Sequence, residues 1–337
     1  MEKRIVSEHE AREVATRSLM TGNLVEKDAA IVADCLIEAE LRGRPTHGLV
    51  RIPGLIRMNR EANPLTKSSG RADIRAVVRT RTCALLDANR NLGYLAGHKG
   101  MSIAIGLARH QGVGLVGVFN TNHSGMLGYY PLMAARHGFI GFAVGNCTPL
   151  MTAYRSREKI FGTNPLAIGI PTADFPILLD MSTSAATYGD LIVALQQGKS
   201  LPTGVAINKD GHATTDPHEA MEGGLLPFGG HKGHALAYVI QLLAGPLVRA
   251  ATIPEPGRNY GLLMLALDPT IFRPREEFEL EAHYLWQSLK QLTPLMDSGE
   301  LLAPGERGHR ERERRRREGI EVEATLWDEL CAIATKK

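Results

Sequence analysis

The segment RPTHGLVR, residues 44–51, contains two side chains that can act together on a small acid. Thr46 is a favourable N-cap residue, so the segment predicts a helix that begins there and holds His47 and Arg51 four residues apart on one face. A guanidinium binds a carboxylate through two hydrogen bonds, whereas an imidazole gives or takes a proton near neutral pH. The pair suits a 2-oxo acid, with Arg51 holding the carboxylate and His47 protonating the carbonyl oxygen as a hydride arrives. An ordinary surface turn is the plainer interpretation of these residues alone.

A second histidine, His123, follows a predicted strand. It stands in NTNHSG, residues 120–125, directly after the apolar run GLVGVF. Because ligands of open α/β sheets collect beyond the carboxyl ends of strands, His123 is a candidate base or hydrogen-bond donor to a substrate. A simple turn residue is the alternative.

Two later segments have the features of phosphate sites. Residues 175–184, FPILLDMSTS, predict a buried strand, then Asp180 and three hydroxyls at a helix start, where free N–H groups attract anions. Residues 226–233, LPFGGHKG, place glycines and Lys232 at the start of a long apolar helix. An acidic turn and a glycine-rich loop are the structural alternatives.

The glycines at positions 112, 114 and 117 satisfy GxGxxG, but their context is wrong for a dinucleotide fingerprint. In a Rossmann unit the glycines follow a strand and open a helix. Here a predicted helix precedes them and the β-like run VGVFN follows. We therefore expect Gly112 to end a helix and the next residues to form a strand.

The surrounding elements predict an α/β protein with helical ends. A capping box at Ser7 opens a helix to Met20, a second helix covers 26–42, and the first 60 or so residues are predicted helical. From Ile74, short β-rich runs alternate with helical segments such as 97–110 and 129–137, which indicates an α/β core. The runs are AVVRT, CALLD, GLVGVF, IGFAVGN, LAIGIP, FPILLD and, after residues 254–261, YGLLMLAL. A helix over 276–290 and an arginine-rich helical region complete the chain.

Composition excludes several classes of partner. The 337 residues contain 39 Lys and Arg against 36 Asp and Glu, so net charge does not favour nucleic acid. In the run RERERRRRE, residues 310–318, glutamates are interleaved with the arginines, which predicts a solvated, ion-paired helix face.

The four cysteines are dispersed and no metal-ligand spacing occurs, so we expect no metal site. No signal peptide or membrane span is predicted, and a cytoplasmic protein is expected.

Seven motifs together resemble the malate/L-lactate dehydrogenase family, the type-2 malate/lactate and sulfolactate-dehydrogenase-like oxidoreductases. The family also includes ureidoglycolate dehydrogenase, diketogulonate reductase and the piperideine/pyrroline-2-carboxylate reductases. The motifs occur in the family's order over nearly the whole chain: THGLVR, NHSGMLGYY, GTNPLA, LDMSTS, ATTDP, GGHKG and PGER.

The resemblance implies a mixed-sheet α/β fold that binds NAD or NADP outside the Rossmann scheme, with helical N- and C-terminal segments and a homodimer. We expect a helical segment, 1–75, that carries His47 and Arg51 and packs with C-terminal helices in 285–337. Residues 76–284 are the expected cofactor-binding core. The implied reaction is hydride transfer between NAD(P)H and a small carboxylate substrate, a 2-oxo acid and its 2-hydroxy acid.

By carry-over from the family, His47 is the proton donor, Arg51 the carboxylate clamp and His123 a second acid/base or substrate ligand. The implied cofactor contacts are Cys147, Thr148, Asp180, Met181, Ser182, Thr183, Ser184, His231, Lys232, Gly305, Glu306 and Arg307.

Departures from the family pattern leave substrate and cofactor type open. Thr46 and Cys147 stand where Ser is usual, Ser124 replaces a bulky residue, and Asp190 replaces a lysine. Arg155 and Arg157 are candidates to meet a 2′-phosphate, although surface exposure explains them more simply. Reduction of a cyclic 2-imino acid is the close alternative reaction. A metal-dependent hydrolase or lyase and a non-catalytic nucleotide-binding relative are the alternatives from other classes.

Overall fold

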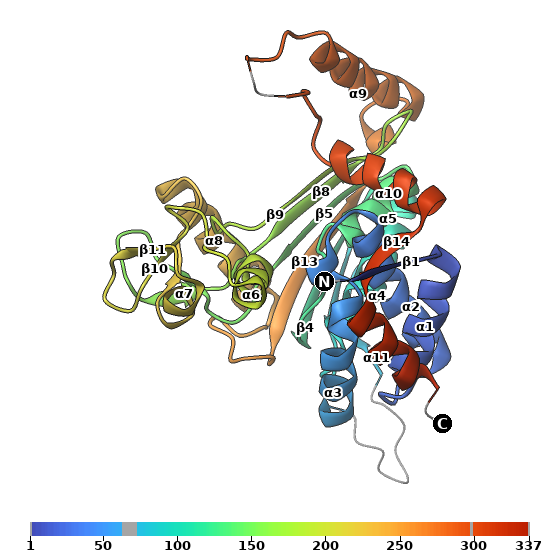
Figure 1. Ribbon diagram of the computed structural model, residues 1–337. Coiled ribbons are helices and arrows are strands. Elements are labelled where there is room, and N and C mark those ends of the chain that lie inside the picture. The colour runs from blue at the N-terminus through green and yellow to red at the C-terminus, as the bar shows by residue number, and fades with distance from the viewer. Residues whose placement is uncertain (1, 63–72, 297–298, 336–337) are drawn as a thin grey trace.

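A mixed seven-stranded sheet runs through the centre of the molecule in the computed structural model, which describes residues 2–62, 73–296 and 299–335 (Figure 1). Strands β3 and β4 are parallel, and the other neighbouring pairs in this sheet are antiparallel. This order differs from the parallel sheet of a Rossmann unit. The strands in spatial order are β2 (Arg75–Arg79), β3 (Cys83–Asp87), β4 (Val113–Thr121), β13 (Tyr260–Leu267), β5 (Ile140–Gly145), β8 (Leu166–Ile170) and β9 (Ile177–Met181).

The seven strands are those that the sequence predicts, and Gly112 is not part of a dinucleotide fingerprint. It ends helix α4 (Gly93–Gln111) in the left-handed region, with φ of +79°, and β4 follows at once. A residue with a side chain is strained in this conformation, so the glycine is required by the helix end.

The two faces of the sheet are covered unequally. Helix α4 lies against β4 and β13, and α5 (Tyr129–Arg136) lies against β5 and β8. The side chains beneath them, such as Val116, Met264 and Ala143, are fully buried. On the opposite face, α8 (His231–Ala244) and the short helix η3 (Pro246–Val248) cover a strip around Val144 and Leu263.

A smaller lobe has its own core (Figure 1). It contains a five-stranded sheet and the helices α6 (Tyr188–Gln197) and α7 (Pro217–Glu222). Its strands in spatial order are β11 (Ala213–Thr214), β10 (Ala206–Ile207), β12 (Gly224–Leu225), β6 (Met151–Thr152) and β7 (Lys159–Phe161).

The two ends of the chain meet. Strand β1 (Lys3–Val6) pairs antiparallel with β14 (Ile320–Glu323), so the prediction of an entirely helical beginning is wrong at its first residues. The strand forms because a partner from the other end of the chain supplies hydrogen bonds that a local pattern cannot show. The helices of this region are α1 (Glu8–Met20), α2 (Glu26–Leu41), α3 (Ile52–Ala62), α10 (Glu306–Glu318) and α11 (Ala324–Ala334).

The arginine-rich helix α10 is only partly a solvated face. Arg314 pairs with Glu311 and Glu318 on the helix surface, as predicted. Arg312, however, lies 3.2 Å from the buried carboxylate of Glu38 on α2, and Arg315 donates to the backbone oxygen of Glu40. Part of the charge run therefore holds α10 to the helix that precedes the candidate site.

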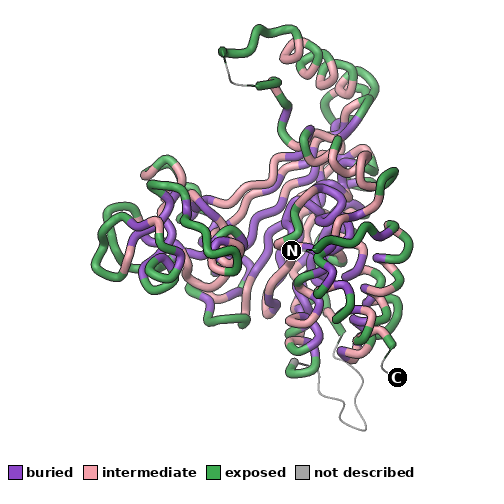
Figure 2. The backbone as a smooth tube through the Cα atoms, in the orientation of Figure 1, coloured by how far each residue is buried: buried purple, intermediate pink, exposed green. Residues whose placement is uncertain are grey.

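Helix α9 (Arg275–Lys290) stands apart from the sheet at the end of the molecule where β13 finishes (Figure 1). It follows the short helix η4 (Pro269–Ile271) and contains no buried residue. Figure 2 shows it green and pink along its length, in contrast to the purple centre of the sheet. Among the described residues, every helix is too short or too polar to cross a membrane.

Candidate active site

The turn that carries His47 and Arg51 is not the single helix that the sequence predicts. It consists of two short 3-10 helices, η1 (Pro45–His47) and η2 (Leu49–Arg51), separated by Gly48, which has φ of −98° and ψ of −144°. The residues are therefore not on consecutive turns of one α-helix. Arg51 instead folds back, and its Nε donates a 2.6 Å hydrogen bond to the backbone oxygen of Thr46.

A buried carboxyl group explains the break at Gly48. Glu40, near the end of α2 and only 3% exposed, accepts a 2.8 Å hydrogen bond from the backbone N–H of Leu49. A Cβ atom on Gly48 would lie 2.1 Å from Oε1 of Glu40, so only glycine fits. Burial raises the pKa of Glu40 to about 7, against the opposing effects of the Leu49 N–H and Arg315. Glu40 thus fixes the course of the backbone between His47 and Arg51.

The fold brings His123 against His47. Their rings stack with centroids 6.1 Å apart and an interplanar angle of 30°. The edge of Tyr94, from α4, meets His123 at 5.9 Å between ring centroids. Within the described part of the chain, the buried Nε2 of His123 and the hydroxyl of Tyr94 have no hydrogen-bond partner. Two unpaired buried polar atoms beside His47 indicate a place for a polar ligand.

Both histidines are neutral near pH 7. Burial, together with the charges of Arg51 and Arg44, lowers the pKa of His47 to about 4, and the charge of Asp190 opposes this shift. Burial, followed by the charges of Arg51 and His47, holds the pKa of His123 well below its usual range. A neutral imidazole accepts a proton, so the site is prepared to act as a base.

The asparagines on either side of Thr121 have structural roles. The side-chain oxygen of Asn122 accepts a 3.0 Å hydrogen bond from the backbone N–H of Gly93. Asn120 has a positive φ of 58°, and its amide donates to the carboxylate of Asp87 at 2.9 Å. Of the predicted NTNH segment, only His123 therefore faces the candidate site.

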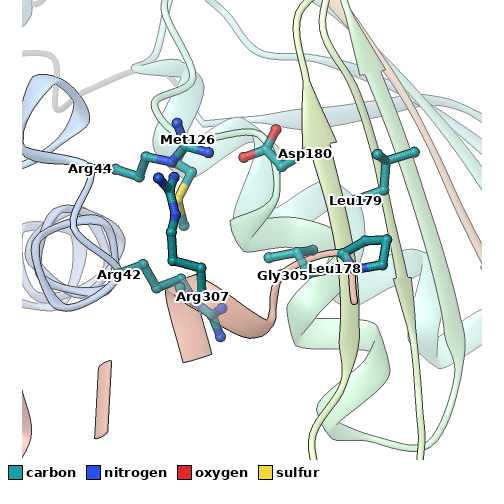
Figure 3. A pocket seen from close by; sticks show the side chains of 10 residues that line it. Arg42, Arg44, Met126, Leu178, Leu179, Asp180, Gly305 and Arg307 are labelled. Carbon is teal, nitrogen blue, oxygen red and sulfur yellow. The ribbon is translucent and has the colours of Figure 1, made fainter. Parts of the chain in front are cut away.

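A cavity of about 240 Å³ lies between the N-terminal helices and β9 (Figure 3). Arg44, Arg307 and Asp180 line it, and the carboxylate of Asp180 faces the ends of the two arginines in Figure 3. No carboxylate of the described residues lies within ion-pair distance of Arg44 or Arg307. Burial raises the pKa of Asp180, although the N–H of Gly128 and the nearby arginines oppose this. Among the described residues, the lining of the cavity thus includes two arginines that form no ion pair and the carboxylate of Asp180.

Gly305 brings the backbone of the PGER motif to this cavity. Its φ is +83°, and a Cβ atom there would lie 2.8 Å from Leu178 on β9. The oxygen of Pro304 accepts a hydrogen bond from the N–H of Leu178 at 3.1 Å. The neighbouring Glu306 is not among the residues that line the cavity. Its carboxylate is held by four partners: Trp286, Ala303, Lys290 and Arg310.

The other predicted cofactor residues form a second group beside β9. Thr183 donates to the backbone oxygen of Thr163 at 3.0 Å, and the thiol of Cys147 lies 3.9 Å from the Thr163 hydroxyl. The N–H of Phe228 donates to the Thr183 oxygen, which places the start of α8 alongside this segment. Within this group, the Thr148 hydroxyl contacts the hydroxyl of Tyr260, and the Ser184 hydroxyl donates to the hydroxyl of Ser182. Met181 is the last residue of β9. His231 and Lys232 lie at the start of α8.

Asp190, at a position where the family resemblance predicts a lysine, caps the start of α6. Its carboxylate accepts from the N–H and the hydroxyl of Thr187 at 2.8 and 2.7 Å, and the Thr187 hydroxyl accepts in return from the N–H of Asp190. Gly189 packs against Thr46, so this helix start lies beside the His47 turn. Asp190 therefore places a negative charge near His47.

The sequence of the chain matches the profile of the malate/L-lactate dehydrogenase family over residues 6–331. The chain belongs to this family. It is 36% identical to a malate/(S)-sulfolactate dehydrogenase of Methanothermus fervidus, over 98% of this chain and 97% of that enzyme.

Solved structures agree with this membership. The sulfolactate dehydrogenase of Methanocaldococcus jannaschii is 34% identical with a TM-score of 0.87, and the two chains are covered to 98% and 96%. The malate dehydrogenase of Entamoeba histolytica is 27% identical with a TM-score of 0.91, covering 99% and 98%. The predictions of a mixed-sheet α/β fold and of a dehydrogenase that interconverts a 2-oxo acid and its 2-hydroxy acid are confirmed.

Three residues of this dehydrogenase site are not among the site residues predicted from the sequence. Tyr94 and Arg44 carry no local signal, because only the folded chain brings them to His123 and to the cavity. Glu40 does have a signal: it falls four residues after Leu36 on the apolar stripe of the predicted helix, where an acid is out of place.

Proposed function

We propose that the chain interconverts a 2-hydroxy acid of the malate or sulfolactate type with its 2-oxo acid, using a nicotinamide dinucleotide. The single observation that carries this proposal is the neutral, stacked pair His47 and His123 beside the guanidinium of Arg51. A base next to a carboxylate-binding cation is what removal of a hydroxyl proton from a 2-hydroxy acid requires. The relatives named above support a second acidic group on the substrate.

The proposed role of each side chain follows from its position in the site. Arg51 uses its Nε on Thr46, so its two terminal nitrogens remain to bind a carboxylate. His47 takes the hydroxyl proton as the 2-oxo acid forms, and returns it in the reverse direction. Arg51 lowers the pKa of His47, so a bound carboxylate that neutralises Arg51 raises that pKa and favours proton uptake. His123 fixes the ring of His47 from its buried side.

The cavity at Asp180 fits part of a dinucleotide. When bound, the nicotinamide group accepts or supplies the hydride. Arg44 and Arg307 would hold a phosphate, Asp180 would accept from a ribose hydroxyl, and the backbone of Gly305 would lie against the ligand. A whole dinucleotide exceeds about 240 Å³, so the remainder would follow the group at residues 182–184 and the start of α8.

The decisive experiment is a substrate panel. NADH and NADPH are each assayed with oxaloacetate, sulfopyruvate, pyruvate and piperideine-2-carboxylate, and the reverse direction is assayed with malate and lactate. We expect the highest kcat/KM with oxaloacetate or sulfopyruvate. Preference for the imino acid would overturn the proposed substrate in favour of the reductase alternative. Cofactor binding without turnover of any substrate would indicate a non-catalytic relative, and activity abolished by EDTA would indicate metal chemistry.

We also propose a homodimer in a reducing compartment such as the cytoplasm. The four cysteines are free thiols, which supports a reducing environment.

The pairing of β1 with β14 and the packing of α11 on α1 support the proposed division of the chain into a helical part, formed by both chain ends, and an α/β core.

A further inference from the structure

A second cavity lies between α3 and the carboxyl end of β4. Its volume is about 710 Å³, which is in the range of ligand sites. It is lined by α3, by the turn before α4, by the end of β4 and by the turn before β13. Among the described residues, it shares no lining residue with the cavity at Asp180. We call it the α3 cavity.

The lining of the α3 cavity is positively charged. It contains three arginines and one acid, Glu61. Arg258 lies 3.9 Å from the carboxylate of Glu255, whereas Arg57 and Arg90 have no ion-pair or side-chain hydrogen-bond partner in the described part of the chain. Arg57 belongs to α3 and Arg90 to the turn before α4. Two unpaired guanidinium groups on separate walls of one cavity attract a ligand with more than one negative charge.

The turn that presents Arg90 has a conformation that arginine rarely adopts. Arg90 has φ of +62°, and the preceding Asn89 has φ of +47°. A glycine would be free of strain at position 90, so the arginine there is costly to the fold. Two hydrogen bonds of 2.9 Å hold the turn, from the N–H of Arg90 to the oxygen of Asn120 and from the Thr121 hydroxyl to the oxygen of Asn91. Strained residues cluster at ligand sites, which supports a binding role for this guanidinium.

Asn259 supplies a further donor from the turn before β13. Its φ is +50°, and its side-chain oxygen accepts a 2.9 Å hydrogen bond from the N–H of Asn120. Its amide nitrogen has no partner among the residues that the structure describes. The described lining contains no aromatic side chain on which a nucleotide base could stack. Guanidinium and amide donors without an aromatic surface therefore suit a small, hydrophilic anion.

We propose that the α3 cavity is an effector site for a small organic anion with two or three negative charges, a polycarboxylate or a phosphate ester. Arg57 and Arg90 bind its charged groups, and the amide nitrogen of Asn259 donates to the same ligand. The site is additional to the proposed substrate site, where Arg51 binds the carboxylate.

The α3 cavity adjoins both elements that lead to the proposed substrate site. Helix α3 begins directly after Arg51, and His123 directly follows Asn122, which lines the cavity. An anion between Arg57 and Arg90 links α3 to the turn that is hydrogen-bonded to the end of β4. It also removes the repulsion between these two arginines. We therefore expect the bound anion to stabilise the arrangement of Arg51 and His123 and to lower the KM for the 2-oxo acid. The effect on KM rests on the proposed reaction, whereas the binding does not.

Isothermal titration calorimetry with citrate and with inorganic pyrophosphate tests the binding without turnover. The protein is first saturated with cofactor, so that the cavity at Asp180 is occupied. We expect one molecule of citrate or of pyrophosphate to bind per chain, and the probe that binds identifies the ligand as a polycarboxylate or a phosphate ester. The double variant Arg57→Gln/Arg90→Gln should weaken this binding about 100-fold or more, because two charge-assisted contacts are lost.

Two control variants locate the bound anion. Arg60→Gln/Arg81→Gln removes the same charge at exposed positions outside the lining, and Arg60 donates instead to the oxygen of Thr21. This variant should bind the anion as the wild type does. Arg51→Gln should also keep the binding, and loss of binding in Arg51→Gln with retention in Arg57→Gln/Arg90→Gln would place the anion in the substrate site.

Gly54 allows a test that adds atoms to the α3 cavity. It lies on α3 three residues before Arg57 and lines the cavity, and a Cβ atom there has no neighbouring atom within 4 Å. Gly54→Glu should fold, because residues with a side chain stabilise a helix relative to glycine. It should abolish anion binding, because its carboxylate enters the cavity beside Arg57. Gly54→Ala adds a single methyl group and is the matched control that keeps binding.

Steady-state kinetics with and without the anion test the effector role. We expect the anion to lower the KM for the 2-oxo acid about 5-fold or more in the wild type, and to have no effect in Gly54→Glu. An unchanged KM despite binding would overturn the effector role. The site itself would be overturned if neither citrate nor pyrophosphate bound, or if binding persisted in both Arg57→Gln/Arg90→Gln and Gly54→Glu. The calorimetry needs no turnover, so its outcome is independent of the substrate panel.

Discussion

The imidazole rings of His47 and His123 stack with their centroids 6.1 Å apart, one from a 3-10 turn after α2 and the other from the end of β4. Burial keeps both rings neutral, and Arg51 lowers the pKa of each. The site therefore combines two neutral imidazoles with one guanidinium, and the proposed transfer of a proton from a bound hydroxy acid rests on this arrangement.

His47→Asn is expected to lower kcat by about 10²- to 10⁴-fold, the usual contribution of a positioned acid or base. Cofactor affinity should stay near the wild-type value, because the asparagine keeps the turn polar and compact. Steady-state kinetics in both directions and a cofactor titration by fluorescence check the two parts. Wild-type turnover in this variant would remove His47 from the mechanism.

Arg51→Gln is expected to raise KM for the 2-oxo acid by about 10- to 100-fold, because a buried carboxylate loses its two charge-assisted hydrogen bonds. The pKa of His47 should rise at the same time, since Arg51 lowers it. Arg51→Lys keeps the charge and should leave that pKa low while KM still rises. Proton NMR of the imidazole signals separates the two variants, and an unchanged KM in both would contradict the clamp.

Stability should fall on acidification because of the buried histidines. The unfolded chain protonates histidine near pH 6.5, whereas folded His47 has a pKa of about 4. Between these values the unfolded state binds more protons, so the free energy of unfolding decreases as the pH falls from about 6.5 to about 4. For His47 alone the loss is on the order of 2 to 3 kcal/mol.

Urea denaturation at pH 7.5 and pH 5 measures this effect. His47→Asn should reduce the difference between the two midpoints, and His212→Asn, at an exposed surface position, should leave it unchanged. Equal reductions in both variants would assign the pH dependence to other groups.

Glu40 and Gly48 should behave as a coupled pair. Gly48→Ala places a Cβ atom 2.1 Å from the Glu40 carboxylate and should lower kcat/KM about 100-fold, because displacement of the turn by about 1 Å has such an effect. Glu40→Gln keeps an acceptor for the Leu49 N–H and should be close to wild type. Glu40→Ala removes the clashing atoms, so the double variant Gly48→Ala/Glu40→Ala should recover part of the activity that Gly48→Ala loses. Strictly additive losses would contradict the coupling.

Arg44→Ala and Arg307→Ala are each expected to raise the KM for the cofactor by about 10-fold, the loss of one charge-assisted contact to phosphate. A rise for NADPH alone would show that the cavity holds the 2′-phosphate, and an equal rise for NADH would show that it holds the pyrophosphate. Arg258→Ala, at a side chain 73% exposed, is the control. Unchanged KM values for both cofactors would place the cofactor elsewhere.

Local patterns in the chain are sufficient to predict the strands of the large sheet, the main helices and the family. Apolar runs bounded by glycine and polar residues mark the strands, and the neighbours of Gly112 show that GxGxxG has the wrong context. The seven motifs, which follow the order of the family, identify the predicted site residues. Their order can be read from the sequence without knowledge of the fold.

How those residues meet depends on long-range packing. The 3-10 break at Gly48 requires a carboxylate from α2, and the stack of His47 on His123 requires the packing of α2, α4 and β4. The cavity joins Arg44, Asp180 and Arg307 from three distant segments. Hydrophobic periodicity indicates which side of a helix or strand is buried. The pKa of a side chain and its distance from another side chain depend instead on the residues that pack against it from other elements, and no local pattern specifies those residues.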